Sequence, residues 1–290
     1  MKELLQVEVT EAPLALISGI TFSQVPYWFP HYPTKDLKLN LICPFGPPEE
    51  RRPLLVWVCG GGFITMDRAA HTPWLLGFAR QGYIVASAEY RRSNSAHFPG
   101  ALEDVKAAIR YLRANAENYG IDPARVAVMG ESAGAYLAAM TGLTNGESEY
   151  DVGAHLEQSS AVSAVVDLYG PSSFLPIPGV TRDESRIPAV FRGPSVTDAF
   201  LGAYAAEEPE LARRASPMDN VTDNAPPFFI AHGTDDPIVP IAHSDRLYEQ
   251  LTAHNIPTEY YPVAGASHAG PQFYQDALRE RILRFLERTL

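Results

Sequence analysis

One short stretch near the middle of the chain constrains the fold more than any other. Residues 126–129 have the composition of a buried strand, and residues 133–141 are rich in Ala, Leu and Met, which favour a helix. Gly130-Glu131-Ser132-Ala133-Gly134 joins the two. So sharp a turn strains the backbone of its central residue and requires neighbours that are nearly free of side chains. The glycines meet that requirement, so we expect the Ser132 hydroxyl to stand exposed above the strand end.

A serine hydroxyl becomes a good nucleophile only with a general base and an acid that orients the base. In the fold that carries the G-x-S-x-G pattern, the acid follows the serine in the chain and the histidine follows the acid. A buried strand at 227–231 runs into a turn with two acids, of which we favour Asp236 and keep Asp235 as the alternative. The candidate base is His268, in a loop of small residues after the next predicted strand. His232 is expected to be structural, and the six other histidines are assigned no chemistry.

A glycine loop lies upstream of the serine. Gly60, Gly61 and Gly62 directly follow a predicted buried strand at 54–58. Consecutive glycines leave backbone N–H groups unshielded, and acyl transfer needs such donors for the oxyanion of the tetrahedral intermediate. The N–H of Ala133, next to the serine, is a further candidate donor.

These motifs occur in the order found in the α/β-hydrolase superfamily, and from about residue 37 onward the chain resembles its hormone-sensitive-lipase-like and feruloyl or acetyl-xylan esterase-like members. The resemblance implies an α/β fold, a doubly wound and mainly parallel sheet with a small cap insertion. It also implies that Ser132 is the nucleophile, Asp236 the acid and His268 the base, and that the oxyanion donors are Gly61, Gly62 and Ala133. The motifs that carry the resemblance are Cys59–Phe63, Ala88–Ser93, Phe98-Pro99, Gly130–Gly134 and His232–Asp236.

One position departs from the family pattern. Where these families usually have a histidine that braces the glycine loop, this chain has Cys59. A thiol is a weak hydrogen-bond donor, so the bracing must come from another residue. We do not expect Cys59 to be a nucleophile, since no base is evident beside it and apolar surroundings disfavour a thiolate.

Strand-like and helix-like segments alternate from the first third of the chain to its end, which is typical of a doubly wound sheet. We interpret the chain as one domain with an N-terminal extension at 1–36 and a cap insertion at 171–222, where seven prolines interrupt the alternation. Early strands are expected at 4–9 and 16–24. The aromatic segment at 25–33 folds across the site or packs against a second subunit in a homodimer, and the sequence leaves both open. The candidates for the substrate pocket are Phe63, Phe174, Phe191 and Phe200.

Composition excludes several classes of function. A net charge of −11 disfavours nucleic acid and anionic membrane surfaces as partners. No apolar run approaches a membrane span and no secretory signal is visible, so we expect a cytoplasmic protein. Cys43 and Cys59 are expected to be free thiols that form neither a disulfide framework nor a metal cluster. We expect no metal and no organic cofactor.

The motifs together predict a serine carboxylesterase that hydrolyses a small-molecule ester through an acyl-enzyme. By resemblance alone, its substrate is a short-chain acyl ester, such as an acetyl or aryl ester of a carbohydrate. A prolyl-oligopeptidase-like peptidase is one alternative, although the large N-terminal domain usual in that family is missing from this sequence. A ligand-binding protein that kept the fold and lost the chemistry is the other.

Overall fold

A computed structural model gives the conformation of most of the chain. It describes residues 2–10, 12–27, 31, 33–46, 48, 50–181, 184–187 and 196–290. Phe191 and several residues of the aromatic segment at 25–33 lie outside the described residues.

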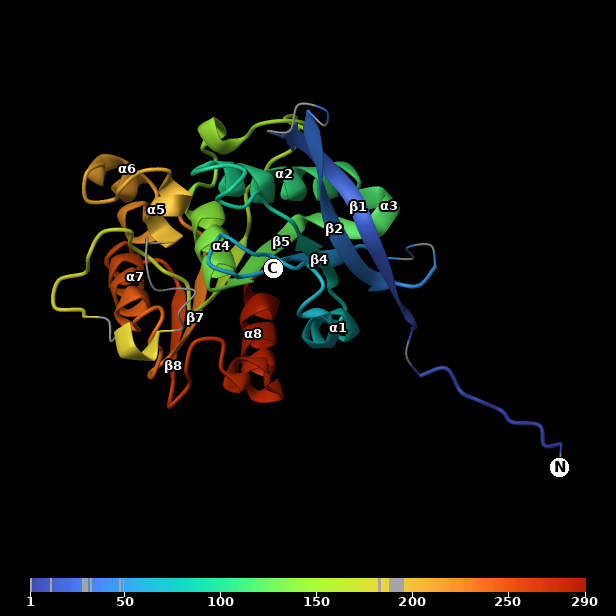
Figure 1. The fold of residues 1–290 in the computed structure, drawn as a ribbon. Coiled ribbons are helices and arrows are strands. Elements are labelled where there is room, and N and C mark those ends of the chain that lie inside the picture. The colour runs from blue at the N-terminus through green and yellow to red at the C-terminus, as the bar shows by residue number, and fades with distance from the viewer. Residues whose placement is uncertain are drawn as a thin grey trace.

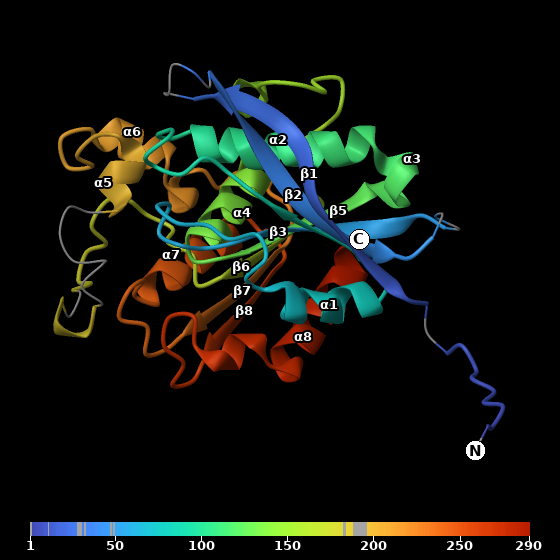
Figure 2. The same ribbon diagram turned by 45° about the vertical axis from the view of Figure 1, so that its right-hand side comes forward.

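A single eight-stranded sheet organises the molecule (Figures 1 and 2). Its spatial order is β1-β2-β4-β3-β5-β6-β7-β8. Strands β1, β2 and β4 pair antiparallel, and β4, β3 and β5 to β8 run parallel, which confirms the predicted fold class. The strands are β1 Leu14–Pro26, β2 Thr34–Pro44, β3 Arg52–Val58, β4 Ile84–Ala88, β5 Ile121–Glu131, β6 Ala164–Leu168, β7 Phe228–Gly233 and β8 Thr258–Val263.

Helices cover both faces of the sheet, because its central strands are apolar throughout. Helices α2, α4 and α7 contribute to the larger core on one face, and α1 and α8 to the core on the other (Figure 2). The helices are α1 Thr72–Arg80, α2 Gly100–Ala114, α3 Ala116–Tyr119, α4 Ala133–Leu143, α5 Val196–Leu201, α6 Pro209–Arg214, α7 Ala242–Ala253 and α8 Asp276–Thr289. All residues of α4 are buried, so this helix is enclosed by the fold.

Two expectations for the N-terminal region need correction. Residues 4–9 form no strand and are exposed, since none of the strands among the described residues pairs with them. The sheet begins at Leu14, so β1 and the start of β2 lie inside the stretch interpreted as an extension. Register decides this, because Leu14 to Pro26 pair with Pro44 to Thr34 along the edge of the sheet.

The chain between β6 and β7 is irregular. Its described part contains the short helices α5 and α6 and the 3-10 turns Glu184–Arg186 and Pro217–Asp219. Figure 1 shows α5 and α6 close together, beside the end of α7. That this segment acts as a cap stays a prediction.

Candidate active site

Ser132 occupies the sharp turn between β5 and α4. Its φ of 51° and ψ of −122° are unusual for a residue with a side chain. The turn is held by the N–H of Ser132, which donates to Leu168 at 2.9 Å, and by its carbonyl, which accepts from Tyr136 at 3.0 Å. The flanking glycines are sterically required, because a Cβ would lie 2.2 Å from the Gly134 carbonyl oxygen at position 130 and 2.0 Å from the Val58 carbonyl oxygen at position 134.

The fold brings His268 and Asp236 to this serine from two separate loops. His268, after β8, places Nε2 2.9 Å from Ser132 Oγ. Its Nδ1 lies 2.6 Å from Asp236 Oδ2, in the turn after β7. The other carboxylate oxygen of Asp236 accepts backbone N–H groups from Ile238 at 2.9 Å and Val239 at 3.0 Å. With both oxygens engaged, Asp236 holds the imidazole with Nδ1–H facing the carboxylate and the Nε2 lone pair facing the serine.

Asp235, the alternative acid, does not face His268. Its carboxylate is mostly exposed and pairs with Arg186 at 2.9 Å.

His232 is buried behind Asp236: its Nε2 lies 2.8 Å from the Val239 carbonyl and its Nδ1 2.6 Å from Ser244 Oγ. Burial by itself would raise the pKa of Asp236, but the hydrogen bonds from His232 and His268 hold that pKa well below its usual range. Asp236 is therefore ionised at neutral pH.

The glycine loop lies against the serine. Gly62 and Ala133 line the cavity in front of Ser132 and His268. Gly61, Gly62 and Phe63 have positive φ values of 129°, 59° and 63°. The Gly61 carbonyl accepts the Thr65 N–H at 3.0 Å, which closes the loop into a tight turn. Gly61 does not itself line the described cavity, so its assignment as an oxyanion donor stays a prediction.

A buried network under this loop supplies the bracing that Cys59 alone would not. It centres on Glu131, whose Oε2 accepts hydrogen bonds from the Tyr169 and Tyr274 hydroxyls at 2.6 and 2.8 Å. Its Oε1 lies 2.8 Å from His71 Nε2 and accepts the Gly60 N–H at 3.4 Å and the Cys59 thiol at 3.8 Å.

Two further contacts fix the glycine loop and the network that supports it. The Tyr90 hydroxyl donates to the Cys59 carbonyl at 2.9 Å. The His71 ring stacks on the Tyr274 ring, with centroids 5.0 Å apart.

His71 and Glu131 form an ion pair in this network. Burial would lower the pKa of His71, whereas its contacts with Cys59 and Glu131 raise it to about 9. Burial would raise the pKa of Glu131, whereas hydrogen bonds from His71, Tyr169 and Tyr274 lower it to about 2. At neutral pH an imidazolium therefore faces a carboxylate directly beneath the glycine loop.

The sequence-based interpretation missed both partners of this pair. Glu131 was visible as a variable position of the serine motif, but no local signal marks His71. The expectation that no base is evident beside Cys59 needs correction, because tertiary packing brings His71 there from the start of α1, although its raised pKa keeps the ring protonated at neutral pH.

Donor atoms of Cys59, His71 and Glu131 all lie within 4.8 Å of one another, a set that zinc accepts. Since these groups already bond to one another, we assign the cluster a bracing role.

The cavity in front of Ser132 is small, about 110 Å³. Phe63 and Phe174 contribute to its wall, together with residues of the segment between β6 and β7 such as Pro171, Val196 and Thr197. Phe200 is not among the lining residues: it is fully buried and stacks against Phe63 with centroids 4.1 Å apart. The expected pocket role of Phe200 thus gives way to a role in supporting Phe63. Phe191 lies outside the described residues.

The sheet order and the site at its carboxyl edge define the chain as an α/β-hydrolase-fold protein. More particularly, the family model BD-FAE matches residues 40–251, and the chain belongs to that family. Esterase LipC of Mycobacterium tuberculosis is 31% identical over 224 residues, which cover 76% of this chain and 54% of LipC. The chain thus spans about half the length of this curated relative.

Solved structures show the same fold. A truncated carbohydrate esterase from gut microbiota superposes with a TM-score of 0.81 at 24% identity, over 95% of this chain and 96% of that one. Esterase Est2 of Thermogutta terrifontis with bound propionate superposes with a TM-score of 0.72 at 25% identity, over 96% and 94%. Within the described residues, none of the helices combines the length and apolarity needed to cross a membrane.

Proposed function

We propose that the chain is a serine carboxylesterase in which Ser132 is the nucleophile, His268 the general base and Asp236 the orienting acid. The observation that carries this proposal is the continuous relay of 2.9 Å from Ser132 Oγ to His268 Nε2 and 2.6 Å from His268 Nδ1 to Asp236. Names of relatives support the reaction class, since LipC and Est2 are both called esterases.

The chemistry follows from the geometry. Ser132 Oγ attacks the ester carbonyl while His268 Nε2 accepts its proton, and Asp236 stabilises the resulting imidazolium. The oxyanion is held by backbone N–H groups of Gly61, Gly62 and Ala133. His268 then returns the proton to the departing alcohol, which leaves an acyl-enzyme, and water repeats the steps in reverse to release the acid.

The size of the cavity supports a short acyl group. Its 110 Å³ is less than the ~150 Å³ of an engineered protein cavity that accommodates benzene. Acetyl and propionyl groups fit such a space, and the propionate in Est2 is consistent with this class. A carbohydrate alcohol, as suggested by the name of the gut-microbiota esterase, is the corresponding proposal for the leaving group.

Two measurements test the proposal. Kinetics with p-nitrophenyl acetate, propionate, butyrate and octanoate should show kcat/KM falling by at least about tenfold, or ~1.4 kcal/mol, from the short to the long esters. Aminoacyl p-nitroanilides should be turned over far more slowly, and the reverse preference would indicate a peptidase. No turnover of either class by a folded protein would favour a binding role.

Ser132→Ala identifies the nucleophile. The variant should lose roughly 10⁴- to 10⁶-fold in kcat, the scale seen when a triad nucleophile is removed. In the wild type, an organophosphate should add to Ser132 and no other serine, as read by peptide mass spectrometry. Labelling at another serine would refute the assignment.

A further inference from the structure

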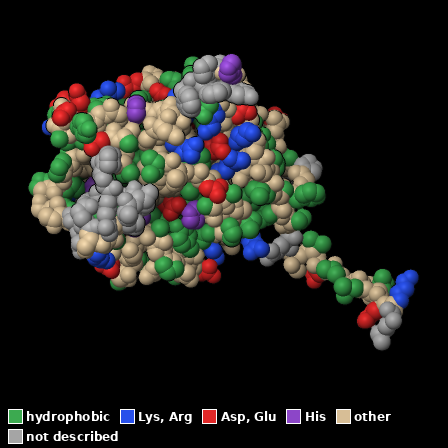
Figure 3. Space-filling model, in the orientation of Figure 1, with side chains coloured by type: hydrophobic (Ala, Val, Ile, Leu, Met, Phe, Trp, Pro, Cys, Tyr) green, Lys and Arg blue, Asp and Glu red, His purple; other side chains and the backbone are tan. Residues whose placement is uncertain are grey.

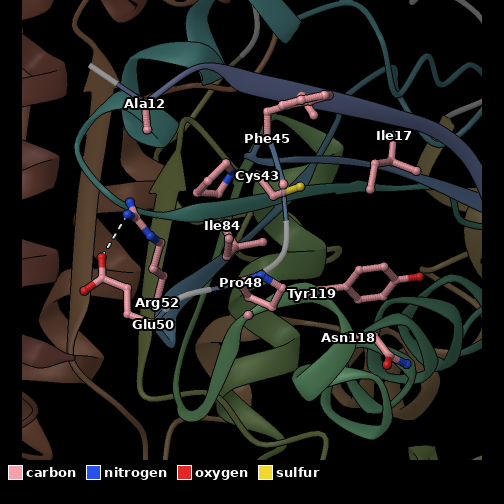
Figure 4. A pocket seen from close by; sticks show the side chains of 14 residues that line it. Ala12, Ile17, Cys43, Phe45, Pro48, Glu50, Arg52, Ile84, Asn118 and Tyr119 are labelled. Atoms are coloured by element: carbon pink, nitrogen blue, oxygen red, sulfur yellow. Dashed lines mark ion pairs between the residues drawn. The ribbon is translucent and has the colours of Figure 1, made fainter. Parts of the chain in front are cut away.

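A second cavity lies at the opposite edge of the sheet from Ser132. Its volume is about 770 Å³, much larger than that of the active-site cavity. Arg52, Ile84 and Gly120 line it, and each stands at or just before the start of a parallel strand. Figure 4 shows its lining residues, with Cys43 and Ile84 near the centre, Ile17 to the right and the Glu50–Arg52 ion pair at the left.

A nine-residue arm leaves the body from the rim of this cavity. Ala12 lines the cavity, and residues 2–10 run away from the sheet into open space (Figures 1 and 2). Leu5, Val7 and Val9 occupy alternate positions and are 80%, 74% and 83% exposed. Gln6 and Glu8 take the positions between them, and Thr10 follows Val9. This alternation is that of a strand, with Leu4 as the one apolar residue on the face that carries Gln6 and Glu8. Figure 3 shows hydrophobic side chains exposed along the arm.

Exposed apolar side chains concentrate here. Of the eleven large hydrophobic residues that are exposed in the described chain, seven lie on the arm, on β1 or at the cavity, namely Leu4, Leu5, Val7, Val9, Leu16, Ile17 and Phe45. Soluble proteins rarely expose so much apolar surface in one region unless it binds something.

The arm points away from the cavity of its own chain, which favours the arm of another copy as the occupant. The Phe45 N–H donates to the Pro13 carbonyl at 2.8 Å, which continues the pairing of β1 with β2 up to the rim. A residue before proline is restricted to extended backbone, so Ala12 continues the line of β1 away from the body. To enter the cavity of its own chain, the arm would have to reverse direction directly before this extended residue.

We propose that the arm of one copy lies in this cavity of a second copy, and that the partner's arm returns the contact in a two-fold dimer. Both halves of the interface, the arm with its alternating apolar residues and the cavity with apolar residues in its wall, are present on the same chain, as a self-complementary interface requires. Nine residues at ~3.3 Å each reach roughly 30 Å, enough to cross between two adjoining bodies. Leu5, Val7 and Val9 would face Ile17, Cys43 and Ile84.

Disulfide trapping tests this placement, because Cys43 is a native thiol in the cavity wall. Val7→Cys, oxidised with copper phenanthroline, should form a reducible species of twice the 31.8 kDa chain mass. Glu8→Cys, on the other face of the arm, is the matched control and should trap far less. Adding Cys43→Ala to Val7→Cys should abolish the dimer band, whereas a band that persists would mean arm-to-arm contact and overturn the proposal.

Two further outcomes would also overturn it. In the Val7→Cys variant, a disulfide from the introduced thiol to Cys43 of the same chain, seen as an oxidised monomer by intact mass, would show that the arm folds onto its own body. A wild type that sediments as a monomer across a concentration series would show that no second copy binds.

The arm can also be changed without touching the fold. Leu5→Asp, Val7→Asp and Val9→Asp combined should give a monomer, while Val152→Asp with Leu156→Asp, two exposed apolar residues elsewhere, should leave the dimer intact. Oligomeric state is measured independently of ester hydrolysis. A monomeric wild type would therefore leave the proposed esterase function untouched, and an inactive protein would leave the proposed dimer untouched.

Discussion

The strained backbone of Ser132 shows how single residues set up this site. A φ of 51° with a ψ of −122° persists only because the surrounding structure determines it, through bonds to Leu168 and Tyr136 and two glycines without room for a Cβ. The result is a hydroxyl held 2.9 Å from His268 before any substrate arrives. Residues that hold this turn therefore contribute to the geometry of the site without reacting themselves.

The two neighbouring acids give a direct comparison. Asp236→Asn should reduce kcat by about 10⁴, because the amide no longer favours the tautomer in which Nε2 accepts the serine proton. Asp235→Asn removes only an exposed pair with Arg186 and should change kcat by less than about twofold, since such pairs contribute ~0–1 kcal/mol. Steady-state kinetics on both variants decide, and a larger loss at position 235 would reverse the assignment.

The His71–Glu131 pair predicts a pH dependence. The pKa of His71 is raised from 6.5 to about 9, so the stability that the pair contributes is fully present below pH 6.5 and is lost as the pH rises through 9. Activity should fall over the same interval as the glycine loop loses its brace. Glu131, lowered from 4.5 to about 2, keeps its contribution down to pH values well below neutrality.

His71→Gln tests this at the residue scale. The amide can still donate to Glu131 but cannot titrate, so the variant should lack the alkaline limb that ends near pH 9 in the wild type. Its kcat should drop by about tenfold with little change in KM, because oxyanion donors act mainly in the transition state. An unchanged alkaline limb would mean that another group titrates there.

At the scale of elements, the packing of α4 against β3 couples stability to catalysis. Gly134→Ala would place a Cβ 2.0 Å from the Val58 carbonyl oxygen and 2.8 Å from the Cys59 carbonyl carbon, both backbone atoms that cannot swing aside. Overpacking of this kind costs ~1–3 kcal/mol or more. Both the free energy of unfolding and kcat should fall, since the strand end that would move leads into the glycine loop.

Gly77→Ala in α1 is the matched control. The three atoms nearest to its Cβ would all belong to the Arg279 side chain, at 2.7 Å, and this long side chain can rotate away. Alanine also favours a helix over glycine by up to ~1 kcal/mol, so stability should be unchanged or slightly higher. Urea unfolding followed by circular dichroism measures both variants. Equal losses for the two glycines would show that the contact of α4 with β3 has no special role.

At the scale of the whole molecule, the sheet separates two functions onto opposite edges. Ser132 follows the carboxyl end of β5, whereas the arm and the large cavity lie where the parallel strands begin. The variant with Leu5, Val7 and Val9 changed to Asp should therefore keep kcat/KM for p-nitrophenyl acetate within about twofold, less than ~0.5 kcal/mol. If this variant lost both the dimer and most of its activity, dimerisation would affect the active site at the other edge of the sheet.

Local chemistry explains what could be predicted from the sequence. Glycines at 130 and 134 around Ser132 specify a sharp strand-to-helix turn, and the alternation of apolar strands with helices specifies a doubly wound sheet. Chain order then brings Asp236 and His268 to the edge of the sheet where Ser132 lies, because carboxyl ends of parallel strands share one edge. Gly120 takes the left-handed conformation with φ of 68° at the end of α3, a backbone geometry that glycine adopts without steric cost.

Contacts between distant segments were decided only by the tertiary structure. His71 reaches Glu131 across 60 positions of sequence, and nothing in the residues around either one signals the other. Phe200 packs behind Phe63 rather than in the cavity. The segment at 4–9 has a strand's alternation, but none of the strands in the described part of the chain pairs with it. Local sequence specifies backbone turns and periodicity, because these depend on neighbours along the chain. Burial and ion pairing depend on neighbours in space, which exist only after folding.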